Sequence, residues 1–419
     1  MSMLLARRDA DAVTTTRRVP VDSQTLATAA AIVEDVRSGG EAALRNHAER
    51  LGDLKPDEKI VYPRDTLRAA SHSLPEGQRS LLERVAGRIE AFAQTQRASL
   101  VDVTVEVEGG EAGHHWIPVA SAGSYAPGGR YPLPSSVLMT VVPARVAGVA
   151  TVWVASPKPA PITLAAASVA GADGLLAVGG AQAVAALAFG TLSPACDLIV
   201  GPGNKWVTAA KKYLYGEVGI DGLAGPSEIL VIADGTGDPV LVAADLLAQA
   251  EHDVEAVPML ITTDARLADA VDGELARQLE DLPTAEIARQ GLSNGFAVVV
   301  GGLAEAVELA TRLAPEHLAL HVDDPEPVAA ELTAYGSLFV GGLSAEAFAD
   351  YGVGPNHVLP TGGGARFQSG LSVATFLRAP TWMRLDTTQN LVEDTAKLAR
   401  LEGLEAHARA ATARSGWVD

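Results

Sequence analysis

The chain has 419 residues, of which 48% are hydrophobic and 5% aromatic, and its formal net charge is −19. The length favours two or more domains, and the negative charge argues against nucleic acid or an anionic membrane as main partner, since either normally needs a basic face. Cys196 is the single cysteine, which excludes an intrachain disulfide and a thiolate zinc cluster. The N-terminus lacks the apolar core of a signal peptide, and the longest apolar run, Val146–Ala155, is too short to span a bilayer, so we expect a cytoplasmic protein.

The predicted elements begin with helices. Thr25–Arg37 has apolar residues at helical spacing and is expected to stop at Gly39-Gly40, and Gln78–Ala98 shows the same pattern. From Thr151 onward, short β-branched runs alternate with Ala-rich helical stretches, and a second series of this kind begins at Glu228. Such alternation indicates βα units around parallel sheets, so we predict an α/β fold with two doubly wound sheets in tandem.

Two glycine-rich segments and a charged end complete the organisation of the chain. Asp221–Pro226 is the predicted seam between the two sheets, and Thr361–Gly364 is predicted to be a flexible loop. Leu391–Ala411 is predicted to form a charged, amphipathic C-terminal helix.

The segment Ala314-Pro315-Glu316-His317-Leu318 sets a carboxylate beside an imidazole at a predicted break between helix and strand. Histidine is the usual proton-transfer residue near neutral pH, and a neighbouring glutamate can orient it or activate a water. Adjacent side chains of a straight strand point to opposite faces, so the two can serve one cavity only if the backbone bends, which Pro315 makes plausible. A solvated surface pair is the alternative interpretation.

Gln249-Ala250-Glu251-His252 lies at the end of a predicted helix, where Gln249 and His252 share one face. An imidazole nitrogen and an amide oxygen could hold a divalent metal, although such a pair is more often solvated. A zinc site without thiolate would draw further His and carboxylate ligands. Asp350 and His407 are candidates that spacing alone cannot select.

The segment Asp350–His357 places an acid and a histidine at the two ends of a glycine- and proline-containing loop, so both can face one pocket. A capping Asp and a turn His are an equally good interpretation. The remaining histidines are interpreted as surface or packing residues, or are given no role: His47, His72, His114, His115 and His321.

Glycine turns precede predicted helices at three places: Gly123–Arg130, Gly179–Gln182 and Ile199–Asn204. Helix N-termini after such turns present free N–H groups to phosphates or other ligands. The turns fall near predicted strand C-termini, where open α/β sheets bind ligands. They do not match the G-x-G-x-x-G fingerprint, so they could equally be tight structural turns.

Together these motifs resemble the histidinol dehydrogenase family. The resemblance runs from about Ile117 to His407 and is carried by blocks in the family's order: Tyr125-Ala126-Pro127-Gly128-Gly129, Val178-Gly179-Gly180-Ala181-Gln182-Ala183, Val200-Gly201-Pro202-Gly203-Asn204, Ala224-Gly225-Pro226-Ser227-Glu228, Gln249-Ala250-Glu251-His252, Ala314-Pro315-Glu316-His317-Leu318 and Gly354-Pro355-Asn356-His357. It implies a zinc-dependent, NAD-linked oxidation of L-histidinol to L-histidine through the aldehyde, with two NAD per turnover, as the last step of histidine synthesis.

The resemblance also implies roles for individual residues. The zinc ligands would be Gln249, His252, Asp350 and His407, which also lie against the substrate, and further substrate contacts would be Ser227, His317, His357 and Glu402. The NAD contacts would be Tyr125, Gln182 and Asn204. His317 would take the hydroxyl proton as hydride leaves, and Glu316 would activate the water that hydrates the aldehyde.

The family's architecture implies two Rossmann-like domains with small helical terminal pieces. We expect an N-terminal segment 1–24, a first domain 25–124 plus 226–375 with the zinc ligands and the Glu-His pair, a second, NAD-binding domain 125–225, and a C-terminal segment 376–419. The resemblance further implies an intertwined homodimer in which the C-terminal segment completes the partner's site.

Two other functions are open at this stage. Arg130 adds a cation that would suit an anionic substrate, and the superfamily includes enzymes for other alcohols, such as sulfopropanediol. The presence of Ser227, Glu402 and His407 favours histidinol. A non-catalytic binding protein is the third alternative, which the intact Glu316 and His317 oppose.

Overall fold

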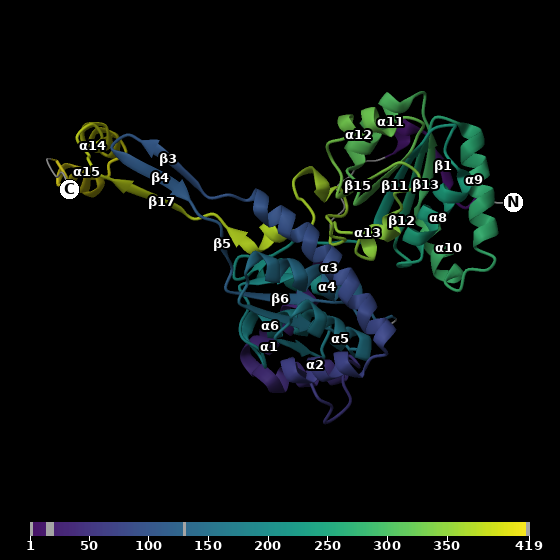
Figure 1. The fold of residues 1–419 in the computed structure, drawn as a ribbon, viewed down its shortest axis with the longest axis horizontal. Helices are drawn as coiled ribbons and strands as arrows, with labels where there is room; N and C mark the ends of the chain where they lie inside the picture. Colours follow the sequence, from purple (N-terminus) through teal and green to yellow (C-terminus); the bar gives the residue numbers. More distant parts are fainter. Residues whose placement is uncertain (1–2, 14–20, 129–130, 416–419) are drawn as a thin grey trace.

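The computed structural model describes residues 3–13, 21–128 and 131–415. They form two α/β domains, each with a six-stranded sheet, and a slender arm that projects away from both (Figure 1). The predicted α/β class with tandem Rossmann-like domains is confirmed. Gly129 and Arg130 of the first glycine turn lie outside the described residues, as do residues 14–20 of the N-terminal segment.

Domain 1 is a fully parallel sheet between two layers of helices, as the alternation after Glu228 predicts. Its three central strands are buried along their whole length, which explains their continuous apolar runs. In sheet order the strands are β1 (Ala6–Arg8), β13 (Phe296–Val299), β12 (Val257–Thr262), β11 (Glu228–Ala233), β14 (His317–His321) and β15 (Ser337–Val340). The helices are α8 (Pro239–Ala250), α9 (Ala265–Gln278), α10 (Ala285–Asn294), α11 (Leu303–Leu313), α12 (Pro325–Glu331) and α13 (Glu346–Asp350).

Domain 2 has a mostly parallel sheet whose strand order changes direction at β6. In sheet order the strands are β10 (Gly219–Ile220), β9 (Leu198–Val200), β6 (Ser121–Tyr125), β7 (Thr151–Ala155), β8 (Gly174–Leu176) and the antiparallel β2 (Val61–Pro63). The next two strands of the sheet, β7 and β8, lie on one side of β6, and β9 and β10 lie on the other. The helices are α1 (Ser23–Arg50), α2 (Arg64–Ser73), α3 (Glu76–Ser99), α4 (Pro134–Ala147), α5 (Pro161–Ala170), α6 (Gly180–Phe189) and α7 (Lys205–Leu214). The C-terminal ends of β6 and β9 therefore flank the switch point at which such sheets bind ligands.

The expected domain boundaries need correction, because the N-terminal helices belong to domain 2. Helix α1 packs on α6 and α7, α2 on α5 and α3 on α4, and β2 extends the sheet beside β8. Conversely, β1 from the N-terminal segment pairs with β13 of domain 1. Apolar spacing shows that a helix has a buried face but not which sheet it covers, so the sequence could not place these helices.

A late segment of the chain also returns to domain 2. After β15 and α13, the chain passes through the short 3-10 helices η2 (Gly364–Arg366) and η3 (Val373–Phe376). Val373 and Phe376 are completely buried in the apolar core that α3, α4 and β7 build. Domain 1 is thus largely an insertion between parts of domain 2.

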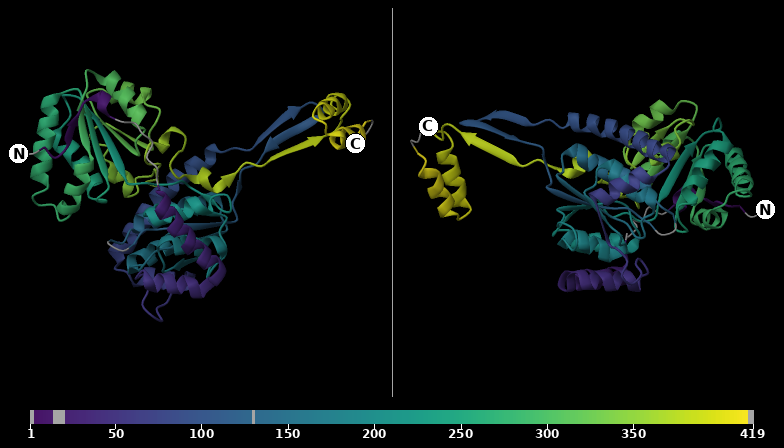
Figure 2. Two further views of the ribbon diagram at one scale, coloured as in Figure 1. Left: turned by 180° about the vertical axis from the view of Figure 1, so that it is seen from behind. Right: turned by 60° about the horizontal axis from the view of Figure 1, so that its bottom comes forward.

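The arm is a three-stranded antiparallel sheet with two helices at its far end, and it projects from the domains in Figure 1 and in both views of Figure 2. Its strands are β3 (Val103–Val107), β4 (Gly110–His114) and β17 (Thr381–Leu385), and the pair β5 (Ile117–Pro118) and β16 (Leu377–Arg378) lies at its base. The predicted single C-terminal helix is two helices, α14 (Val392–Leu401) and α15 (Glu405–Thr412), because Gly403 takes a positive φ of 76° between them.

Two smaller features complete the fold. The predicted helix stop at Gly39-Gly40 is a kink, since Gly40 has non-helical angles and α1 then continues to Arg50. Residues Ala10–Ala12 form the 3-10 helix η1. Within the described ranges, no helix is both long and apolar enough to cross a bilayer.

Candidate active site

Glu316 and His317 both turn into the interior of domain 1. The chain bends at Ala314, which takes a left-handed φ of 51° at the end of α11, one residue before the expected bend at Pro315. Gly336 then donates to the Pro315 carbonyl at 2.9 Å. Glu316 is 6% and His317 4% exposed, and the carboxylate oxygen Oε2 lies 3.7 Å from Nδ1 of the imidazole. The interpretation as a solvated surface pair is therefore wrong.

The backbone of Glu228, at the start of β11, orients both side chains. Its N–H donates to Glu316 Oε2 at 2.9 Å, and its carbonyl lies 3.1 Å from His317 Nδ1. Donation from Nδ1 to that carbonyl selects the tautomer in which Nε2 carries the free lone pair. The neighbouring strands β11 and β14 thus hold a carboxylate and an imidazole in fixed positions.

The last turn of α8 brings Gln249 and His252 to the same place. Gln249 is completely buried, and its amide nitrogen can donate to the Glu228 carbonyl at 3.2 Å and to Glu346 Oε1 at 3.3 Å, while the same nitrogen lies 3.1 Å from His317 Nδ1. That orientation turns the amide oxygen away from these acceptors. His252 Nε2 lies 3.5 Å from Asp350 Oδ2. The expectation that these residues share a site with Asp350 agrees with this geometry.

Asp350 and His357 also meet, as the loop between them predicts. His357 Nδ1 lies 3.1 Å from the Asp350 carbonyl and 3.8 Å from its carboxylate Oδ1. The loop is fixed against domain 2, because Arg88 donates to the Gly352 carbonyl at 2.8 Å and Asn356 donates to the Met139 carbonyl at 2.6 Å. The cluster therefore lies where the two domains meet.

A divalent cation fits this cluster. Ligand atoms of His252, Glu346 and Asp350 all lie within 4.8 Å of one another. Among the described residues, Glu346 Oε2 and His357 Nε2 are buried without a hydrogen-bond partner. Imidazole and carboxylate donors without thiolate match a zinc site of the His and carboxylate type. Glu346 was not among the predicted site residues, although it precedes Asp350 by four residues, the spacing that puts two side chains on one helix face.

Burial dominates the electrostatics of the site. It raises the pKa values of Glu316 and Glu346 well above the usual range, with neighbouring carboxylates adding to the effect. It lowers the pKa of His317 to about 4 despite the opposing charge of Asp350. Burial would also raise the pKa of Asp350, but its bond to His252 and the surrounding imidazoles lower it below the ordinary value. Burial lowers the pKa of His357 as well, and it would lower that of His252, but the bond and charge of Asp350 raise it above the ordinary value. The site thus crowds several carboxylates around imidazoles, an arrangement that a bound cation would stabilise.

The cluster sits at the N-terminal edge of the domain 1 sheet. Glu228 and His317 are the first residues of β11 and β14, which run parallel and adjacent. Open α/β sheets usually bind ligands at the opposite, C-terminal edge. His321, at that other end of β14, is buried and bonds Asp245 at 2.9 Å, so it does not join the cluster.

Domain 2 brings Tyr125 and Gln182 together at the C-terminal edge of its sheet. The Tyr125 hydroxyl accepts from Gly180 N at 3.2 Å, and Gln182 is in the first turn of the same helix, α6. Gly201 has a φ of 112°, and any side chain there would collide with the Tyr125 carbonyl, so the turn after β9 packs directly against β6. Asn204 in that turn caps α7 by accepting from Trp206 N and Val207 N.

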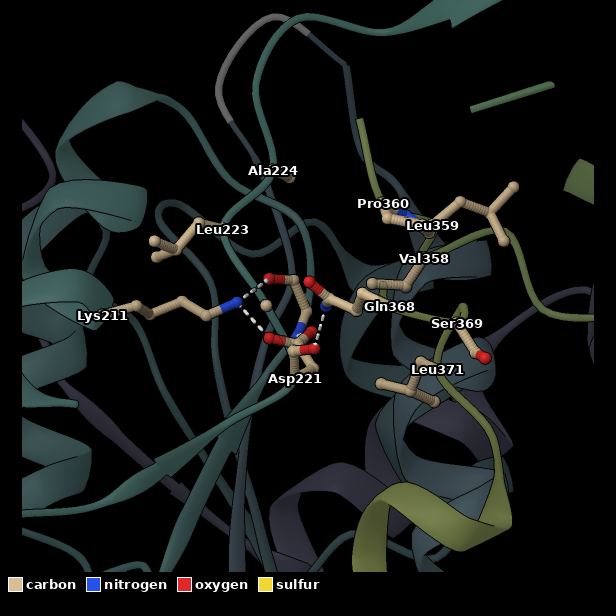
Figure 3. A pocket seen from close by; sticks show the side chains of 12 residues that line it. Lys211, Asp221, Leu223, Ala224, Val358, Leu359, Pro360, Gln368, Ser369 and Leu371 are labelled. Carbon is tan, nitrogen blue, oxygen red and sulfur yellow. Dashed lines mark hydrogen bonds and ion pairs between the residues drawn. The ribbon is translucent and has the colours of Figure 1, made fainter. Parts of the chain in front are cut away.

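A buried ion pair fixes the turn that carries Asn204. Lys211 and Asp221 bond each other with side chains only 4% and 5% exposed (Figure 3). Lys211 also donates to the Gly201 carbonyl, and Asp221 accepts from Gly201 N. Gln368 donates to the backbone carbonyl of Asp221, which ties the predicted seam to the chain that returns from domain 1.

The remaining predicted residues divide between the cluster and the arm. Ser227 immediately precedes Glu228, and its carbonyl accepts from Val257 N, so it stands at the same edge of the sheet. Glu402, the residue that caps the C-terminus of α14, and His407 on α15 are both exposed, and these two helices lie at the far end of the arm (Figure 1). A single chain therefore does not assemble the complete predicted set.

The comparisons with known proteins agree with the motifs. The family model described as histidinol dehydrogenase matches residues 15–415. The chain belongs to the histidinol dehydrogenase family. Among the curated proteins of that name, the one from Thermus thermophilus is 49% identical over 383 residues, covering 90% of this chain and 92% of the relative. The one from Haloarcula marismortui is 45% identical over 391 residues, covering 91% of this chain and 92% of the relative. A crystal structure of histidinol dehydrogenase from Elizabethkingia anophelis has a TM-score of 0.92 at 32% identity and covers 99% of this chain and 98% of its own.

Proposed function

We propose that this protein catalyses the zinc-dependent, four-electron oxidation of L-histidinol to L-histidine through L-histidinal, using two NAD, as the last step of histidine biosynthesis. The observation that carries the proposal is the buried Glu316-His317 pair beside His252, Glu346 and Asp350, whose ligand atoms are close enough together to hold a metal ion. An alcohol oxidation followed by hydration of an aldehyde needs one group that removes the hydroxyl proton and another that activates water. The site offers both.

His317 is proposed to take the hydroxyl proton at Nε2, because Nδ1 faces the Glu228 carbonyl. Glu316 is proposed to activate the water that hydrates the aldehyde. Its Oε2 is held by Glu228 N, which leaves the second carboxylate oxygen for this role. Glu316 Oε2 lies 3.7 Å from His317 Nδ1, so both groups could act on one bound substrate without moving it.

Gln249, His252 and Asp350 are proposed to hold zinc together with His407 of the partner subunit. When bound, zinc would fix the amine and imidazole of the substrate and polarise groups next to it. Ser227, His317, His357 and Glu402 are proposed as further substrate contacts, and Tyr125, Gln182 and Asn204 as the NAD contacts. Tyr125 at the end of β6 and Asn204 after β9 flank the switch point of the domain 2 sheet, where dinucleotides bind in open α/β folds, which supports this proposal.

We further propose a cytoplasmic homodimer in which each arm completes the partner's site. The exposed apolar side chains on the arm support this, since Val105 is 51%, Met383 73% and Leu401 86% exposed. Surfaces of this kind in a folded protein usually mark an interface. Glu402 and His407 are exposed on the same arm, so docking of the arm onto the partner subunit would bring both residues to the partner's active site.

The test is NADH production by zinc-replete protein with L-histidinol and, separately, with dihydroxypropanesulfonate, each with and without a chelator. We expect turnover of histidinol that the chelator abolishes. Turnover of the sulfonate alone would instead support the sulfopropanediol alternative, which the comparisons do not favour. No turnover of histidinol by the zinc-replete protein would refute the proposal.

A further inference from the structure

The side chain of Asp53 contacts the turn before α6 and has no role in the proposed function. It lies in the loop between α1 and β2, and its Oδ2 accepts from Gly179 N and from the amide nitrogen of Gln182, each at 2.9 Å. Gly180 N is used as well, because it donates to the Tyr125 hydroxyl. The N–H groups of Gly179 and Gly180 are therefore both bonded within the protein, and the acceptor of the first is the Asp53 carboxylate.

These contacts argue against a phosphate at the turn. A helix N-terminus binds phosphate through free N–H groups and its positive dipole end, and here Asp53 has taken that place. Asp53 is only partly exposed, and this burial raises the pKa of its carboxyl group, opposed by the bonds from Gly179 and Gln182. A second anion beside it would be repelled, whereas a hydroxyl that donates a hydrogen bond would be complementary.

Two oxygen atoms at the turn are left to accept such a bond. Gln182 is 1% exposed, and because its amide nitrogen faces Asp53, its Oε1 is buried with no partner among the described residues. Oδ1 of Asp53 makes no hydrogen bond within the described part of the chain, and the residue is partly exposed. A carboxylate oxygen near an amide oxygen suits a vicinal diol, which donates two hydrogen bonds.

The strand order shows why a carboxylate is needed here. In NAD-binding units of this topology, an acidic residue after the second strand accepts the ribose hydroxyls. That strand is β7 in domain 2, and the loop after it contains no acid but the exposed Lys158, whose charge acts on Asp53. Pro157 of the same loop packs against Gly179. Asp53 therefore supplies, from another element, the carboxylate that the β7 loop lacks.

We propose that Asp53, together with Oε1 of Gln182, accepts hydrogen bonds from the adenosine ribose diol and selects NAD over NADP. The inference rests on the proposed NAD-linked function. A 2′-phosphate would remove one donor and place an anion beside the carboxylate. Asp53 would thus have two effects, binding the diol and orienting the amide that shares this task.

The test compares NADH and NADPH binding, measured by nucleotide fluorescence, in wild-type protein, Asp53→Asn and the control Asp57→Asn. Asp57 is exposed in the same loop, so its variant makes the same charge change away from the turn. Asparagine at 53 keeps an oxygen for Gly179 and Gln182 but turns an NH₂ group toward the diol. We expect D53N to weaken NADH binding roughly 10- to 100-fold, the usual loss for a hydrogen bond to a charged group, with NADPH changed much less and D57N unchanged.

The activity of the same variants separates this inference from the proposed function. With histidinol and saturating NAD, D53N should keep kcat within about threefold while the KM for NAD rises, because only cofactor binding is altered. Equal weakening of NADH and NADPH, or an unchanged preference, would overturn the inference while leaving the function intact. Absence of histidinol-dependent NADH production in the wild type would overturn both.

A second variant tests the inference independently if D53N unfolds at a much lower temperature than the wild type. Lys158→Ala changes an exposed side chain whose charge acts on Asp53, and it should weaken NADPH binding several-fold while NADH binding is retained, because a cation beside that carboxylate would attract a 2′-phosphate. An equal effect on both nucleotides would place the 2′ position elsewhere and overturn the inference.

Discussion

Replacing Glu316 by glutamine should separate the two half-reactions of the proposed mechanism. Glutamine keeps an oxygen that can accept from Glu228 N, now at 2.9 Å, so the free energy of unfolding should change by no more than about 1 kcal/mol. Alanine would remove the Glu316 acceptor of that buried N–H and should cost about 1–3 kcal/mol. The lost carboxylate, by contrast, removes the base for water activation, which is typically worth about 10²–10⁴ in rate.

The assay supplies histidinol and histidinal separately and follows NADH formation by E316Q. Oxidation of histidinal should fall by about 10²–10⁴, whereas the first oxidation of histidinol should stay within about tenfold of wild type, because His317 is intact. Glu308→Gln, an exposed glutamate on α11, is the matched control and should change neither rate. Equal loss of both oxidations by a folded E316Q protein would refute this division of roles.

Three further predictions concern the partner, the metal and the seam. Mixing inactive His317→Ala and His407→Ala proteins should restore about a quarter of wild-type activity, since half of the dimers are hybrids and each has one intact site; no recovery after subunit exchange would mean that the arm serves its own chain. Zinc at about a hundred times its Kd should raise the unfolding free energy by about 2.7 kcal/mol, and a thermal melt of Asp350→Ala should show a far smaller rise. Asp221→Asn should cost about 3–5 kcal/mol in a urea titration, because it leaves Lys211 charged and buried; a loss below 1 kcal/mol would contradict this.

The local patterns predicted the elements, but long-range contacts decided their arrangement. Alternating runs after Thr151 and Glu228 give parallel sheets because each buried strand needs a covering helix, and this part was predictable. The placement of α1–α3 was not, since any sheet face can cover an apolar stripe. The arm could not be predicted either, because its strands β4 and β17 pair with each other although most of the sequence lies between them.

The candidate site shows a similar division. Glu316 and His317 were found because they adjoin at a predicted break, and Gln249 and His252 because helical spacing aligns them. The contribution of Glu228 could not be predicted, because its backbone atoms, which every residue has, orient the pair. Asp53 gave no signal at all, since its partners are distant in sequence and join it only when α1 packs on domain 2.

The return of the chain from domain 1 to domain 2 has a consequence for biosynthesis. Phe376, completely buried among residues of domain 2, is made only after the whole of domain 1 has been synthesised. On the ribosome, domain 2 therefore cannot close its core when its own sheet emerges, and its apolar surface stays open while domain 1 is translated. We expect chaperones to hold nascent chains at this stage, and truncations before residue 376 to aggregate rather than yield a free NAD-binding domain.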